Sequence, residues 1–228
     1  MAPFLPMLVY GDHVACSLDD RLGWPEYLSS SMPAGTPWGQ LINCSERTNR
    51  GFGDTVRQVG RAVLDRRGRK PIGSVFVALS HIDGRNCRLS PDDKGVGPLV
   101  RLAVRHATSL IDPDGGGHVW IVGPTGGGVP SGPKPKKGVE PDPNAPPVPA
   151  LEAPPCFGGY ERWVHRMDEA IEAALAVEGE PPARYISLAH LPRKYTRDGV
   201  IPIANGWRWV AQRVIRMVAG DGKIIEEG

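Results

Sequence analysis

The sequence has no apolar run close to the roughly 20 residues that a membrane-spanning helix needs. Its opening stretch, MAPFLPMLVYGD, lacks the basic region and the small-residue cleavage site of a secretory signal peptide. It also lacks a C-x-x-C pair, and such wide cysteine spacing favours reduced thiols over a disulfide framework. The sequence therefore predicts no membrane segment and a protein that is cytoplasmic as synthesised. The four cysteines are Cys16, Cys44, Cys87 and Cys156.

The sequence also has little net charge. Its 27 basic and 25 acidic residues leave a formal charge of +2 at pH 7. Binding to nucleic acid or to an anionic membrane depends on a concentrated basic face. From this overall balance we expect neither nucleic acid nor a membrane as a partner.

Short apolar runs alternate with amphipathic stretches along the chain. The apolar runs predict five strands, and apolar residues at three- and four-residue spacing predict the helices between them. In the last helix, Asn205 is a candidate N-cap. Because this alternation is typical of a parallel sheet covered on both faces, we expect a three-layer α/β domain. The expected strands cover residues 4–10, 40–44, 72–79, 118–122 and 184–189, and the expected helices residues 55–66, 96–111, 160–177 and 205–219.

Glycine and proline are abundant, with 29 and 24 residues, and their excess is concentrated in one segment. Residues 126–155 include ten prolines, which exclude a helix or a central strand and favour polyproline II or irregular structure. We expect a Pro/Gly-rich insertion or arm within a single domain of residues 1–220, followed by a C-terminal tail at 221–228. Polyproline II segments lose little entropy on ordering, so the arm is a candidate docking segment for a partner protein. A solvated linker is the alternative.

Residues that can carry chemistry follow the predicted strands. In an open parallel sheet, ligands bind beyond the carboxyl ends of the strands. The four blocks are, in chain order, Gly11-Asp12-His13, Gly53-Asp54-Thr55, Ser80-His81-Ile82-Asp83 and Asp198-Gly199-Val200-Ile201. In this order and spacing they resemble the blocks of the SGNH (GDSL-type) esterase/lipase family, and the resemblance runs from about residue 6 to residue 217.

The resemblance implies a flavodoxin-like α/β/α fold with strand order 2-1-3-4-5 and no cofactor. In the family, the first block supplies a serine nucleophile. The second supplies a glycine N–H and the third an asparagine for the oxyanion, and the last supplies the aspartate and histidine of the triad. This chain keeps the glycine as Gly53 and the aspartate as Asp198. It has His13 at the serine position, Ile82 at the asparagine position and Ile201 at the histidine position.

These substitutions predict a degenerate member of the family with no catalytic residues of the family's kind. An isoleucine neither carries a proton nor donates a hydrogen bond, and losing the nucleophile and the base together removes the mechanism. We therefore expect a catalytically inactive domain that acts as a structural or binding module and has protein partners in an assembly. The absence of a targeting segment and the excess of arginine over lysine, 20 to 7, lead us to predict a bacteriophage virion component, such as a minor capsid, decoration or tail protein.

Two kinds of repurposed site stay open. Asp12, His81 and Asp83 neighbour the expected pocket, and a His–Asp pair there could run acid–base chemistry in an esterase or acetylhydrolase with a non-standard catalytic set. His13, His81 and Asp198 are also of metal-ligand type, although no two of them lie at a compact ligand spacing on one element.

A carbohydrate-binding protein is a further alternative. Such a protein would keep the pocket for recognition and stack Trp24, Trp38 or Trp207 on a sugar. Because Trp207 lies on the apolar stripe of the last predicted helix, it is better explained as a core residue, which leaves the first two.

Overall fold

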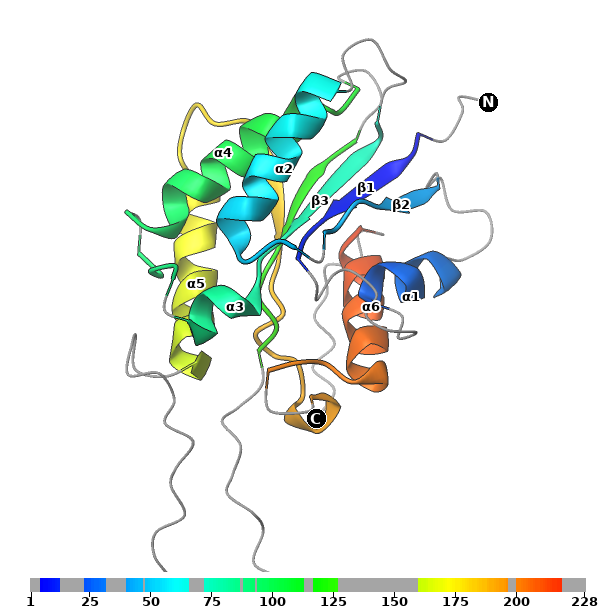
Figure 1. The fold of residues 1–228 in the computed structure, drawn as a ribbon, viewed down its shortest axis with the longest axis vertical. Coiled ribbons are helices and arrows are strands. Elements are labelled where there is room, and N and C mark those ends of the chain that lie inside the picture. The colour runs from blue at the N-terminus through cyan, green and yellow to red at the C-terminus, as the bar shows by residue number, and fades with distance from the viewer. Residues whose placement is uncertain are drawn as a thin grey trace, which may run out of the picture.

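A computed structural model describes residues 5–12, 23–31, 40–46, 48–65, 72–86, 88–92, 94–112, 117–126, 160–196 and 200–218. In this part of the chain, five short strands form one sheet (Figure 1). Its order is β2-β1-β3-β4-β5, and every neighbouring pair is parallel. The strands are β1 (Met7–Tyr10), β2 (Leu41–Asn43), β3 (Ser74–Ala78), β4 (Val119–Val122) and β5 (Ala183–Ile186).

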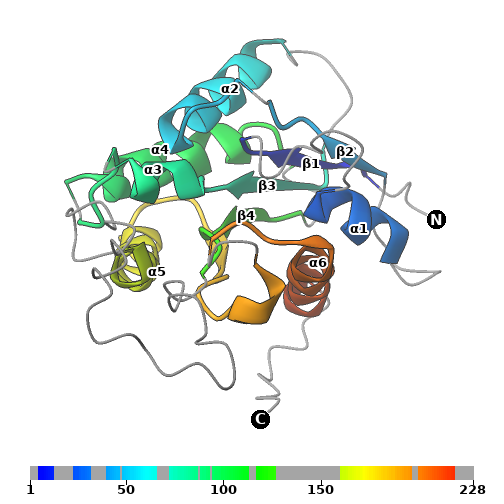
Figure 2. The same cartoon turned by 60° about the horizontal axis from the view of Figure 1, so that its bottom comes forward.

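Helices cover both faces of the sheet (Figure 2). One face carries α2, α4 and α5, with the short α3 beside them, and the other carries α1 and α6. The predicted three-layer α/β/α fold and its strand order are confirmed. The helices are α1 (Trp24–Ser31), α2 (Phe52–Asp65), α3 (His81–Arg85), α4 (Val96–Thr108), α5 (Tyr160–Leu175) and α6 (Ala204–Val218), with a 3-10 turn, η2 (Arg193–Tyr195).

The strands build two hydrophobic layers because successive side chains point to opposite faces. In β1, Leu8 and Tyr10 pack with the α2, α4 and α5 layer, whereas Met7 and Val9 pack with α1 and α6. All four side chains are buried, which explains why this strand appears in the sequence as a continuous apolar run. The sheet is therefore a rigid support, and its carboxyl edge positions the loops that follow.

Several predicted boundaries differ from the structure. The strand expected at 184–189 ends at Ile186, because the apolar residues beyond it are held by packing and loop hydrogen bonds rather than by a strand ladder. Asn205 is not an N-cap: α6 begins at Ala204, and the Trp207 N–H already donates to the Ile203 carbonyl at 2.9 Å. The helices α1 and α3 were not expected from the sequence.

The chain leaves the sheet after β4 at Gly126 and returns in α5 at Tyr160. The Gly126 N–H donates to the Leu188 carbonyl at 2.9 Å, which ties this exit to the segment after β5. Apart from Gly126, the expected arm at 126–155 lies outside the described residues, as does the expected tail at 221–228. No helix in the described ranges is both long and apolar enough to cross a bilayer.

Candidate functional site

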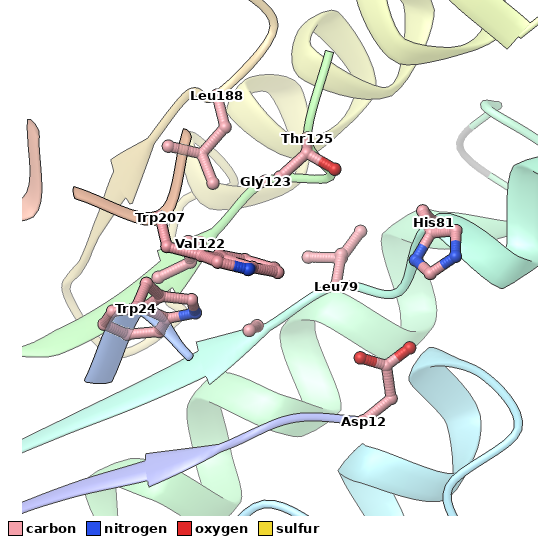
Figure 3. Close-up of a pocket in the computed structure, with 10 residues that line it drawn as sticks. Asp12, Trp24, Leu79, His81, Val122, Gly123, Thr125, Leu188 and Trp207 are labelled. Carbon is pink, nitrogen blue, oxygen red and sulfur yellow. The ribbon is translucent and has the colours of Figure 1, made fainter. Parts of the chain in front are cut away.

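A small pocket lies at the carboxyl edge of the sheet, and the first and third strand-end blocks contribute to its lining (Figure 3). Its volume is about 10 Å³, roughly the space that one water molecule needs. Asp12 and His81 lie on one side of the pocket and the rings of Trp24 and Trp207 on the other, with Leu79 between them. The pocket is lined by Asp12, Trp24, Ala78, Leu79, His81, Val122, Gly123, Thr125, Leu188 and Trp207.

The first block enters the site directly from β1. Asp12 is only 1% exposed, and its carboxylate accepts a hydrogen bond from the Ser80 hydroxyl. The carbonyl of Gly11 accepts a hydrogen bond from the Asn49 side chain at 2.9 Å, which joins this turn to the loop before α2. His13, which follows Asp12, lies outside the described residues.

The third block forms the turn from β3 into α3. Ser80 is the N-cap of this helix: its extended backbone has φ −91° and ψ 136°, and its hydroxyl oxygen accepts from the Ile82 N–H at 3.0 Å. The same hydroxyl donates to Asp12, so one side chain joins two blocks. His81 is buried and lines the pocket, whereas Ile82 is half-buried and does not line it.

Asp83 joins the third block to the second. It is 5% exposed and accepts a hydrogen bond from the Phe52 N–H, at the start of α2, at 2.7 Å. Burial raises the pKa of Asp83 from 3.8 to about 6; the Phe52 N–H opposes this rise and the charge of Asp12 adds to it. Gly51 makes the approach possible, because a Cβ atom there would lie less than 3.0 Å from the Asp83 carboxylate.

The predicted oxyanion donor, Gly53, lies in the first turn of α2. A Cβ atom at this position would meet only the Arg57 guanidinium, at 4.0 Å, so packing does not require a glycine here. Helix N-termini present backbone N–H groups without partners inside the helix. A donating role of the Gly53 N–H stays a prediction.

The last block is hydrogen-bonded to the segment that follows β4. Val200 accepts a hydrogen bond from the buried Thr125 hydroxyl at 2.9 Å, and Ile201 is half-buried against the hydrophobic core. The Tyr160 hydroxyl donates to the Thr125 carbonyl at 2.8 Å. Thr125 thus holds the block-five loop and the start of α5 together, whereas Asp198 lies outside the described residues.

The described side chains at this edge include groups that can exchange protons. They include two buried carboxylates and one buried imidazole, from Asp12, Asp83 and His81. Within the ranges that the structure describes, no three histidine, cysteine, aspartate or glutamate side chains converge as metal ligands. Of the metal-ligand candidates from the sequence, His81 lies in the pocket, and His13 and Asp198 lie outside the described residues.

Sequence reasoning missed two residues that shape the site. Gly51 permits the contact of Asp83 with α2, and Thr125 connects the strand-four exit to the last block. The glycine two residues before Gly53 was a visible signal for the first, whereas a lone threonine gave none for the second. Of the tryptophans considered for sugar stacking, Trp24 and Trp207 are both buried beside the pocket, and Trp38 lies outside the described residues.

Comparison with known proteins supports the fold. No family model matches this chain, and no curated protein is similar to it in sequence. Among solved structures, a member of the lipolytic protein G-D-S-L family from Veillonella parvula DSM 2008 has a TM-score of 0.61 at 14% identity, over 94% of this chain and 98% of the other.

Two further solved structures are similar to the same extent. The M. smegmatis aryl esterase has a TM-score of 0.58 at 14% identity and covers 95% of this chain and 99% of its own. Est24, a carbohydrate acetylesterase from Sinorhizobium meliloti, has a TM-score of 0.55 at 14% identity with the same coverage. These structures show that the chain has an SGNH-hydrolase-like α/β/α fold. Because the sequence identity is only 14%, the similarity concerns the fold alone.

Proposed function

We propose that this chain uses an SGNH-hydrolase-like fold as a binding or structural module and does not carry out serine ester hydrolysis. The observation that carries the proposal is the set of residues at the three reacting positions: His13, Ile82 and Ile201. A serine esterase needs a hydroxyl nucleophile, a base that takes its proton and donors for the oxyanion. According to the resemblance, this chain keeps only one of these groups, the Gly53 N–H as a donor for the oxyanion.

The pocket supports the same proposal. Its volume is about 10 Å³, and its lining away from Asp12 and His81 is mostly apolar. Ile201 is half-buried against the hydrophobic core, and its side chain cannot take a proton. A role in an assembly, such as a phage particle, is part of this proposal and rests on the sequence alone.

A second candidate is favoured by the solved structures, whose described activities are those of esterases and an acetylesterase. For this chain the observation in its favour is that Asp12 and His81 line one pocket. In such a mechanism the His81 imidazole would take a proton from a water molecule as the water oxygen attacks the ester carbonyl. The bond from the acyl carbon to the alcohol oxygen then breaks, and the leaving alkoxide takes the proton from His81.

Turnover of p-nitrophenyl acetate by the purified chain separates the two candidates. We expect the wild type to match the buffer rate, and the triple variant His13→Ser/Ile82→Asn/Ile201→His to exceed it, because the triple variant restores the three reacting groups. The matched control is Ile201→His alone, which adds an imidazole without a nucleophile. Wild-type turnover that is lost in His81→Ala or His13→Ala would overturn the proposal and support the second candidate.

A further inference from the structure

The exposed side of α2 carries a basic groove that lies away from the strand-end pocket. The groove has a volume of about 840 Å³ and runs along the helix from the loop before it. Three arginines line it: Arg50 in the loop, and Arg57 and Arg61 on the helix. We call these three residues and the space between them the α2 groove.

The arginines of the α2 groove present their charges to solvent. The side chains of Arg57 and Arg61 are 74% and 66% exposed, and they lie one helical turn apart on the same side of α2. Among the described residues, no carboxylate lies within ion-pair distance of the exposed Arg50 guanidinium. One extended polyanion could therefore contact all three guanidinium groups.

Two carboxylates in the groove pair with two of the arginines and leave the lining with a net charge of +1. Asp54 pairs with Arg57, and Glu46 lies 3.7 Å from Arg61. Exposed pairs of this kind are weak and are screened by salt, so a ligand with several negative charges can compete with them. The lining keeps three cationic groups against two anionic ones.

The floor of the groove brings a polyanion close to the helix. Gly60 has no side chain, and a Cβ atom there would lie 2.8 Å from the His106 ring of α4. The imidazole therefore packs directly against the helix at Gly60. His106 is among the residues that line the groove.

The sequence around α2 is more basic than the chain as a whole. Residues 46–70 carry eight basic and three acidic side chains, a net charge of +5, whereas the whole chain has a net charge of +2. The expectation that nucleic acid is not a partner used only the whole-chain value. Four of the basic residues, Arg66, Arg67, Arg69 and Lys70, directly follow α2 in the sequence and lie outside the described residues.

We propose that the α2 groove binds the phosphodiester backbone of double-stranded nucleic acid. Arginine is suited to phosphate because its planar guanidinium offers paired donors and stays charged. A protein interface of similar size normally has aromatic or apolar anchors at its centre, and single-stranded nucleic acid is normally held by stacking aromatics. The described lining of the groove has no phenylalanine, tyrosine or tryptophan and one well-exposed apolar side chain, Leu64.

The test is fluorescence anisotropy of the full chain with a labelled mixed-sequence DNA duplex of about 25 base pairs, and with an RNA duplex of equal length. Each neutralised phosphate contributes about −0.9 to the slope of log affinity against log salt on B-DNA. With at least three contacts, we expect the affinity to fall at least about 40-fold between 50 and 200 mM salt. Comparison of the affinities for the DNA duplex and the RNA duplex shows which of the two the groove prefers.

The variant Arg57→Gln/Arg61→Gln should weaken binding at 50 mM salt by at least tenfold and reduce the salt slope by about 1.8. Arg50→Gln, which lies outside the helix, should reduce the slope by about 0.9. The matched control is Arg162→Gln/Arg166→Gln, an exposed arginine pair with the same spacing on α5, which should leave binding unchanged. Thermal melting verifies that all variants are folded.

Three results would overturn the proposal. One is the absence of duplex binding at 50 mM salt, and another is duplex binding that the α2 variants do not weaken or that the α5 control weakens equally. The third is binding to polyglutamate or to phosphatidylserine vesicles in preference to both duplexes, which would assign the groove to an acidic protein or to a membrane surface. None of these results depends on esterase activity. The test of duplex binding is therefore independent of the test of the proposed function.

Discussion

The two sides of the strand-end pocket differ in chemistry. On the side of β1 and β3, the Ser80 hydroxyl joins Asp12 to the start of α3, and nearby Asp83 accepts from the Phe52 N–H at the start of α2. On the side of β5 and α6, the lining is apolar, with Leu188 and Trp207. The polar side thus keeps hydrogen bonds that shape the blocks, while the described lining near β5 and α6 holds no carboxylate or imidazole.

Under the proposed function, the shape of this fold is kept by contacts that do not depend on a reaction. Ser80 and Asp83 act on backbone N–H groups at the starts of α3 and α2, so their contribution to folding does not depend on a reaction. A base at the Ile201 position would be useful only to a nucleophile. We therefore expect the loss of a polar contact of Ser80 or Asp83 to lower stability more than a conservative change at the half-buried Ile201.

The largest expected effect is that of Gly51→Ala. Its new Cβ atom would meet the Asp83 carboxylate at less than 3.0 Å, so the carboxylate must move and release the Phe52 N–H. We expect the free energy of unfolding to fall by about 3 kcal/mol, measured by urea denaturation. The control is Gly53→Ala, where the nearest atom is 4.0 Å away and stability should be unchanged or slightly raised. Equal losses in both variants would contradict the account of the polar side.

The pH dependence of stability should reveal Asp83. Its pKa is about 6 in the folded protein and 3.8 ordinarily, so the native state holds the proton more tightly than the unfolded state. The stabilisation is present at low pH and is lost as the pH rises through 6. Relative to Asp83→Asn, the free energy of unfolding of the wild type should fall by about 2 kcal/mol between pH 4.5 and 7.5. Parallel pH profiles of the two proteins would show that this carboxyl is not the titrating group.

A smaller loss is expected for Ser80→Ala. The variant removes both the N-cap acceptor of α3 and the hydrogen bond to buried Asp12. Stability should fall by about 1.5 kcal/mol. Ser109→Ala is the control, because its exposed hydroxyl donates only to the Arg105 carbonyl within the last turn of α4. If Ser80→Ala loses no more stability than Ser109→Ala, the contacts of Ser80 with Asp12 and with the start of α3 do not stabilise the fold.

The smallest effect is expected at Ile201, which packs with the layer of α2, α4 and α5 and does not line the pocket. Ile201 is half-buried, so Ile201→Val removes one methylene group from a site that remains partly solvated. We expect a loss of about 0.5 kcal/mol in thermal or urea denaturation. A loss above that of Ser80→Ala would reverse the proposed order of the polar contacts and Ile201.

The sequence was sufficient for the fold wherever local patterns were strong. The β-branched, buried runs around Val9, Val77 and Ile121 predicted strands, because residues covered on both faces are apolar throughout. α1 was missed because its sequence, WPEYLSSS, contains a proline and three serines and has only a short apolar stripe. α3 has five residues and includes Gly84, so periodicity could not reveal it.

The contacts of the site were harder to predict because they join distant parts of the chain. Asp83 reaches Phe52 across 31 positions, and Thr125 reaches Val200 across 75. The order of the blocks was enough to place Asp12, His81 and Asp83 at one edge of the sheet. It could not reveal the close approach at Gly51. The basic face of α2 was missed for another reason, since the net charge of the whole chain averages over separate surfaces.

The central claim, that the fold is retained without a serine nucleophile, is tested most directly by intact-mass spectrometry after treatment with a fluorophosphonate ester. This reagent phosphonylates a serine that a neighbouring base activates. We predict no adduct on the folded wild-type chain and a single adduct at position 13 of the His13→Ser/Ile82→Asn/Ile201→His variant. A stoichiometric adduct on the wild type that disappears when the protein is unfolded beforehand would contradict the account, because it would reveal an activated nucleophile.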